Sequence, residues 1–160
     1  MALPNSGHVE LAGDDAAAQI ARLSRDHIEH GLAWGWTEDR VRAALGDADT
    51  NVAVIRAGAR VQAFGIMRYS ERHAHLLLLA VRPAERRQGL ATAIVTWLES
   101  VALAAGSERV VVECRRSNDA ARCLYLDLGY HERLIESRMY GGREVGILLE
   151  KWLRSREPGA

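Results

Sequence analysis

The chain has 160 residues, of which 48% are apolar and 26% charged, as is typical of a globular protein with a buried core. Its 21 basic residues balance 21 acidic ones. This neutrality argues against a nucleic-acid partner, because phosphate backbones bind surfaces with an excess of cations. The N-terminal segment Met1–Gly13 has no basic stretch followed by an apolar run, and no apolar run in the sequence comes near ~20 residues. We therefore expect a cytoplasmic protein without a membrane partner.

Two residue types exclude further classes. Lys151 is the only lysine in the sequence, which rules out the phosphate-binding loop that requires Gly-Lys-Ser/Thr. Cys114 and Cys123 form neither a disulfide framework nor a zinc motif, and the six histidines are scattered. We therefore expect no metal ion.

The first half of the chain predicts two helices and a β-hairpin. Apolar residues at helical spacing indicate a helix from Asp14 to about His30. Thr37 is a typical N-cap for a short second helix, which Gly46 ends. Residues 51–56 and 61–69 then predict two strands joined by a tight turn.

The second half alternates strands and helices. We expect a strand at 75–81, a helix at 90–105, a strand at 109–114, a helix at 119–128, and a closing hairpin of 130–140 and 144–152. The strand at 75–81 is a continuous apolar run, which predicts cover on both faces, and the β-branched, apolar segment 109–114 predicts a buried strand. The order of elements indicates the α/β class, with a mixed central sheet of about six to seven strands and flanking helices.

The segment 81–92 predicts a phosphate site, because it leaves a buried strand and enters a helix. The first N–H groups of a helix have no intrahelical partner, and the helix dipole favours an anion there. Gly89 and Ala91 would let a pyrophosphate approach the main chain, Thr92 offers a hydroxyl, and the Arg86–Arg87 pair offers charge. The alternative interpretation is a basic surface loop with a glycine at a tight turn.

Two motifs, in this order, resemble those of the GNAT superfamily of N-acetyltransferases. The first is R/Q-x-x-G-x-G/A between a strand and a helix, matched by Arg86-Arg87-Gln88-Gly89-Leu90-Ala91. The second is an asparagine followed by Tyr-x-x-x-Gly-Tyr/Phe, matched by Asn118 and the run from Tyr125 to Tyr130. The resemblance covers about residues 51–152. It implies a single GNAT domain over 1–160, with two strands splayed apart at the acyl-CoA site.

The resemblance also implies acetyl-CoA as co-substrate and places its contacts. The pantetheine arm is expected on the strand end formed by Leu79, Ala80 and Val81. The residues expected around the pyrophosphate are Arg86, Arg87, Gln88, Gly89, Leu90, Ala91 and Thr92. Asn118 is expected beside the pantetheine, although a residue directly before a helix is also a typical N-cap.

A narrower resemblance bears on the chemistry. The block from Val112 to Asn118, together with Tyr125 and the segment 140–144, is similar to the bacterial ribosomal-protein N-terminal alanine acetyltransferases. By that resemblance Glu113 is the general base and Tyr125 the general acid. The alternatives are a salt bridge from Glu113 to Arg115, and a core position for Tyr125.

The acceptor is expected to be a primary amine, with the α-amine of a peptide or protein N-terminus favoured. An α-amine has a pKa of about 7.7–8.0 and a lysine one of about 10.4, so a single carboxylate suits the former. A small-molecule amine and a non-catalytic role as an acyl-CoA sensor are the alternatives. Trp36, Tyr140 and Arg143 are expected at the acceptor site, with ordinary packing as the alternative. Both a monomer and a dimer remain open.

Overall fold

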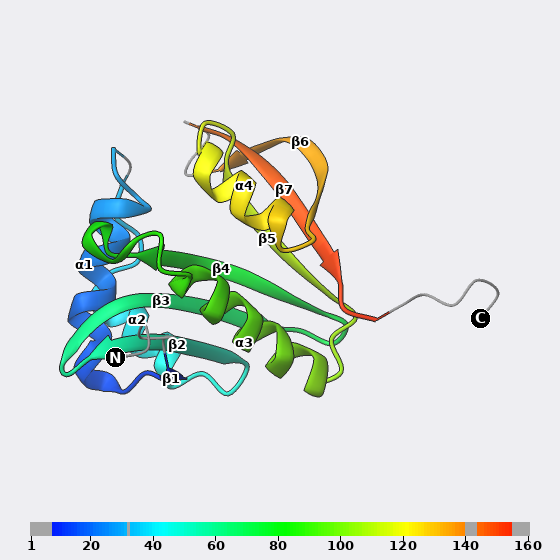
Figure 1. Ribbon diagram of the computed structural model, residues 1–160. Helices are drawn as coiled ribbons and strands as arrows, with labels where there is room; N and C mark the ends of the chain where they lie inside the picture. The colour runs from blue at the N-terminus through cyan, green and yellow to red at the C-terminus, as the bar shows by residue number, and fades with distance from the viewer. Residues whose placement is uncertain (1–7, 32, 140–143, 155–160) are drawn as a thin grey trace, which may run out of the picture. The chain divides into compact units, whose positions relative to one another are not determined.

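The computed structural model describes residues 8–31, 33–139 and 144–154, of which 134–139 and 144–145 are described by their backbone only. Within these residues the chain forms seven strands and four α-helices (Figure 1). Their bounds are β1 Val9–Leu11, α1 Ala17–His27, α2 Glu38–Leu45, β2 Thr50–Ala57, β3 Arg60–Tyr69, β4 His73–Val81, α3 Leu90–Ala104, β5 Arg109–Arg115, α4 Asp119–Asp127, β6 His131–Met139 and β7 Glu144–Trp152.

The strands form a mixed sheet in the order β1-β2-β3-β4-β5-β7-β6, with β4 and β5 parallel. The α/β class, the number of strands and the flanking helices are therefore confirmed. The chain divides into two compact units, the first comprising residues up to 68 and 77–98, the second 69–76 and those from 99 on. Strand β4 contributes to both. That the chain is a single domain stays a prediction.

The first unit packs helices against β2, β3 and the second half of β4. Side chains of α1 and α2 form a core with one face of these strands, which includes Phe64 and Leu78. The opposite face meets α3, because a Cβ on Gly65 would lie 2.7 Å from Ile94 Cγ2. Neighbouring residues of a strand point to opposite faces, so Phe64 packs against α1 and α2 while Gly65 faces α3.

The second unit contains the first half of β4, then β5, β7 and β6. The parallel ladder joins β4 residues 73–76 to β5 residues 109–112, and β5 pairs antiparallel with β7 along its whole length. Lys151 pairs with Val110 and reaches Glu99 of α3, which marks the face that the helices cover. Figure 1 shows α4 over that same half of the sheet. On the other face, the described residues of β5 are only half-buried.

Three expectations about the inner strands change with the structure. Strand β4 begins at His73, two residues earlier than predicted, because His73 and Ala74 pair with β5. The predictions that 75–81 is covered on both faces and that 109–114 is a buried strand are wrong. Along β4 and β5 buried residues alternate with half-buried ones, since one face of each strand packs in a core while the other stays partly open.

Candidate active site

The turn between β4 and α3 has the backbone expected of an anion site. Arg87 has a φ of 65° and is the only non-glycine residue with positive φ in the described part of the chain. The left-handed conformation costs an ordinary residue roughly 1–2 kcal/mol, and such strain concentrates at ligand sites. Gly89 follows with a φ of 77°. Turns of this kind direct neighbouring N–H groups to one side, where they form a concave anion receptor.

The space beside this turn is open. A Cβ added to Gly89 would have no protein atom within 4 Å. Helix α3 makes its first main-chain hydrogen bond from Ala93 to the carbonyl of Gly89, so the N–H groups before Ala93 precede the helical ladder. Leu90 is buried and anchors the helix start, whereas Arg86, Arg87, Gln88, Gly89 and Thr92 are exposed and Ala91 is half-buried. The residues present therefore fit a pyrophosphate.

Arg82, which the sequence analysis did not single out, anchors the base of the turn. Its N–H donates to Gln62 O at 2.9 Å, and its guanidinium donates to Val61 O at 2.5 Å and to Gln19 Oε1 at 3.1 Å. Burial and the neighbouring Arg60 lower the pKa of this guanidinium below its ordinary value, and Arg22 adds to the effect. These contacts fix the end of β4, where the pantetheine arm is predicted.

The predicted pantetheine strand, 79–81, lies beyond the residues of β4 that pair with β5. The ladder ends at Leu76 and Val112. Leu79 and Val81 are half-buried, whereas Ala80 is buried in the core of the first unit. Contact of this strand with the pantetheine, and the splaying of the two strands, stay predictions.

Glu113 lies on the open face of the second unit. It pairs with Leu148 of β7 and alternates with buried Val112 and Cys114. Its side chain lines a cavity of about 450 Å³. A carboxylate placed in this way is accessible to an amine that arrives over the open face.

Tyr125 is buried at 4% exposure on α4, and its ring meets that of Tyr130 at 5.5 Å and 60°. Behind this ring pair lies a polar cluster that the sequence analysis missed. Tyr130 donates its hydroxyl proton to Glu99 Oε2 at 2.8 Å, and Lys151 Nζ contacts Glu99 Oε1 at 2.9 Å. Burial, reinforced by Glu99, raises the pKa of Tyr130 far above its ordinary value. The signals were an acidic residue on the apolar side of α3 and the single lysine of the chain.

Asn118 is the N-cap of α4, as the alternative interpretation had it. Its Oδ1 accepts from the N–H of Ala121 at 3.1 Å, and its carbonyl accepts from Arg122 at 3.1 Å. This capping role is confirmed. A contact between Asn118 and the cofactor stays a prediction.

The predicted acceptor residue Trp36 lies in the connection between α1 and α2, half-buried under the guanidinium of Arg40 at 4.0 Å. Buried Glu29, which the sequence analysis did not identify, holds this connection. It accepts hydrogen bonds from Gly35 N at 2.7 Å, Trp36 N at 3.2 Å and Ser24 Oγ at 2.9 Å. A role for Trp36 in acceptor binding stays a prediction. Tyr140 and Arg143 lie outside the described residues.

The described residues contain no group of three or more histidine, cysteine or carboxylate side chains that could hold a metal ion. None of their helices is long and apolar enough to cross a membrane.

An α/β sheet that carries after β4 a turn suited to an anion, and on β5 a half-buried carboxylate that lines a cavity, fits an acyltransferase that binds a pyrophosphate-containing substrate. Residues 13–130 match the model of the Acetyltransferase (GNAT) family. The chain is 32% identical over 127 residues to the [Ribosomal protein bS18]-alanine N-acetyltransferase of Escherichia coli K12, an alignment that covers 77% of this chain and 85% of the relative. The chain therefore belongs to the GNAT family and is an acetyl-CoA-dependent N-acetyltransferase.

Solved structures share the fold. The ribosomal-protein-S18-alanine N-acetyltransferase from Escherichia coli has a TM-score of 0.77 at 24% identity, covering 96% of this chain and 98% of its own. Ard1 from Thermoplasma volcanium has a TM-score of 0.80 at 18% identity, with 94% and 99% covered. An aminoglycoside 6'-N-acetyltransferase complexed with coenzyme A has a TM-score of 0.77 at 14% identity, also with 94% and 99% covered.

Proposed function

We propose that the acceptor is the α-amine of a peptide or protein N-terminus. The observation that carries the proposal is Glu113, a single carboxylate in an open cavity on a strand face. At pH 7.5 roughly a quarter to two fifths of α-amines are neutral, against about 0.1% of lysine side chains, given their ordinary pKa values. One modest base is therefore enough for an α-amine. The relative that is 32% identical acts, by its name, on an alanine of a ribosomal protein, which supports a protein acceptor.

The turn that ends in α3 is proposed to hold acetyl-CoA through its pyrophosphate. Acetyl-CoA supplies an acetyl group activated as a thioester. The N–H groups of Gly89, Leu90 and Ala91 would donate to the phosphate oxygens, and Arg86 and Arg87 would add charge-assisted contacts. The backbone of residues 79–81 is proposed to position the pantetheine arm.

Two side chains of the second unit are proposed to move protons. The carboxylate of Glu113 takes the proton that the amine loses on attack, directly or through water. The hydroxyl of Tyr125 donates a proton to the departing sulfur. Tyr125 is only 4% exposed, so its side chain is shielded from bulk water. We place this reaction in the cytoplasm.

A screen for release of the free CoA thiol tests the proposal. The purified protein is mixed with acetyl-CoA and, separately, with short peptides bearing a free α-amine, the same peptides with a blocked α-amine and a free lysine, and small amines such as polyamines and amino sugars. Turnover confined to free α-amines supports the proposal. Turnover with small amines alone would replace it with a small-molecule acceptor.

A further inference from the structure

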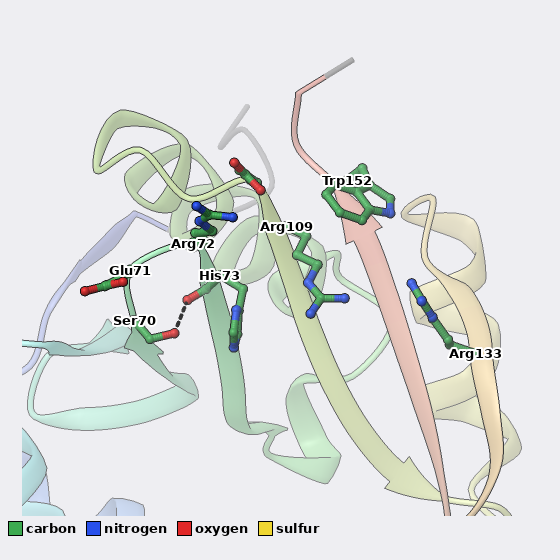
Figure 2. A pocket seen from close by; sticks show the side chains of 8 residues that line it. Ser70, Glu71, Arg72, His73, Arg109, Arg133 and Trp152 are labelled. Carbon is green, nitrogen blue, oxygen red and sulfur yellow. Dashed lines mark hydrogen bonds between the residues drawn. The ribbon is translucent and has the colours of Figure 1, made fainter. Parts of the chain in front are cut away.

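The cavity at Glu113 continues along the open face of the second unit. A second cavity of about 620 Å³ shares His73, Arg109 and Arg133 with the first and extends to Trp152. These side chains come from β4, β5, β6 and β7, and Figure 2 shows the guanidinium of Arg109 between His73 and Arg133. Together the two cavities form a groove that starts at Glu113.

A buried carboxylate organises the floor of this groove. Glu150 accepts from Arg109 Nη1 at 2.7 Å, from Arg133 Nη1, and from Trp152 Nε1 at 3.3 Å. Its side chain is only 7% exposed, while those of Arg109 and Arg133 are 31% and 54% exposed. Burial opposes its ionisation, but the hydrogen bonds from Arg133 and Arg109 outweigh that effect and keep the pKa of Glu150 below its ordinary value.

This arrangement leaves binding capacity on the two arginines. Each guanidinium has five N–H donors and gives one to Glu150 in the contacts above. Two positive charges face one buried negative charge, so this part of the groove keeps a net positive charge. The end of the groove at Glu113 carries a carboxylate. The far end of the second cavity is lined by Glu71, Glu108 and Arg72, so two carboxylates offset the charge of Arg72 there. The positive part of the groove is therefore the part at Arg109 and Arg133.

The spacing along the strands matches an extended peptide. Glu150 pairs with Val111, which is two residues from Glu113 on β5 and therefore roughly 7 Å away. In an extended chain the first and third residues point the same way and are separated by the same distance. A peptide with its amine at Glu113 would present its third side chain at Arg109 and Arg133.

We infer that this groove selects acceptor peptides with an acidic side chain at the third residue, which Arg109 and Arg133 bind. The inference rests on the proposed function, because it needs a peptide amine at Glu113. The second residue points away from the arginines, so a charge there has no effect. A planar, forked guanidinium pair suits a carboxylate better than it suits a neutral amide.

The experiment compares amidated peptides that differ at one position, with the full-length protein. Ala-Ser-Glu-Ala-Ala-amide is measured beside its analogues with Gln or Lys at the third residue, and beside one with Glu at the second. We expect kcat/KM about tenfold higher for Glu than for Gln at the third residue, the effect of one charge-assisted hydrogen bond. The advantage should shrink in Arg133→Gln, survive in Arg133→Lys and shrink with added salt. Arg154→Gln is the matched control, since exposed Arg154 contacts Leu103 O instead.

Each outcome of this experiment either supports or overturns the inference. Equal turnover of the Glu and Gln peptides, or a preference that survives in Arg133→Gln, overturns the inference while leaving peptide acetylation intact. Failure of every peptide, with turnover of small amines, overturns the proposed function and the inference with it. Melting curves of each variant show that a changed ratio does not come from unfolding.

Discussion

Replacing Gly89 by glutamate tests whether the turn before α3 binds the pyrophosphate of acetyl-CoA. The new side chain would have room, because no protein atom lies within 4 Å of its Cβ. The φ of 77° makes any other residue strained by about 1 kcal/mol. For a chain of this size that loss lowers the Tm by about 2–4 °C, so the variant should fold.

Binding should suffer far more than folding. A carboxylate about 5 Å from one phosphate charge costs about 3 kcal/mol at an effective dielectric constant near 20. Solvent and salt reduce this cost at an exposed turn, so about 1.5–3 kcal/mol is realistic. Since 1.4 kcal/mol is a factor of ten, we expect acetyl-CoA to bind about 10- to 100-fold more weakly. Isothermal titration calorimetry on the folded variant measures this directly.

Two further variants separate charge from backbone strain. Gly89→Ala carries the strain without the charge and should lose stability by a similar amount but little affinity. Gly106→Glu is the matched control at the other end of α3, where φ is 94° and the space for a Cβ is equally open. It should bind acetyl-CoA normally. Unchanged affinity in a folded Gly89→Glu protein would refute the assignment of the turn.

Three more outcomes are expected. Glu113→Gln should lower turnover by ~10²-fold or more, most strongly at low pH, with acetyl-CoA affinity nearly intact; a wild-type pH–rate profile would reduce Glu113 to a structural role. Tyr125→Phe keeps the buried ring, so steady-state kinetics should show turnover ~10²-fold lower with the KM for the amine little changed. Full activity with a normal melt would show that the thiolate leaves unaided. Glu150→Gln should destabilise the protein at neutral pH, because hydrogen bonds from Arg133 and Arg109 outweigh burial and depress the pKa of Glu150 in the folded state. A depressed pKa contributes stability above the unfolded value near 4.3, and that stability is lost as pH falls through the folded value. Denaturant titrations from pH 7 to pH 3 should therefore show the two proteins converging; a constant difference would contradict this origin.

Local signals were sufficient for most of the fold. The N-cap Thr37 was identified from its residue type before a helical pattern, and its Oγ1 indeed accepts from the N–H of Arg40 at 3.4 Å. Helix α3 begins at Leu90, and the β2–β3 hairpin turns between Ala57 and Arg60, where the tight turn between the two strands was predicted. Such features depend on neighbours within a few residues, which is the range over which sequence patterns carry information.

The missed features depend on distant partners. Strand β1 has only three residues, and it is a strand because Val9 and Leu11 pair with Ile55 and Ala53. Glu29 resembles a surface carboxylate in sequence, yet both it and Glu99 are buried. The partner of Glu99, Lys151, lies 52 residues away. Burial of a charge shows only when the chain has brought its partner to it.

The candidate site shows the same division. The turn at residues 86–92 could be found from sequence because its chemistry lies in consecutive residues. The groove beside Glu113 could not, since Arg109, Arg133, Glu150 and Trp152 come from three strands that meet only in the sheet. The alternation of buried and half-buried residues along β5 was likewise not visible in its sequence, because most of its residues are apolar.

The two proposed proton carriers lie on different sides of β5. Glu113 faces the open groove, whereas Tyr125 packs on Tyr130, over whose ring Lys151 lies on the face that the helices cover. Neither group needs to pass its proton to the other, so one pKa need not serve both tasks. It follows that substitutions in the groove, such as Arg133→Gln, should alter the KM for the acceptor without altering acetyl-CoA affinity, while Gly89→Glu should do the reverse.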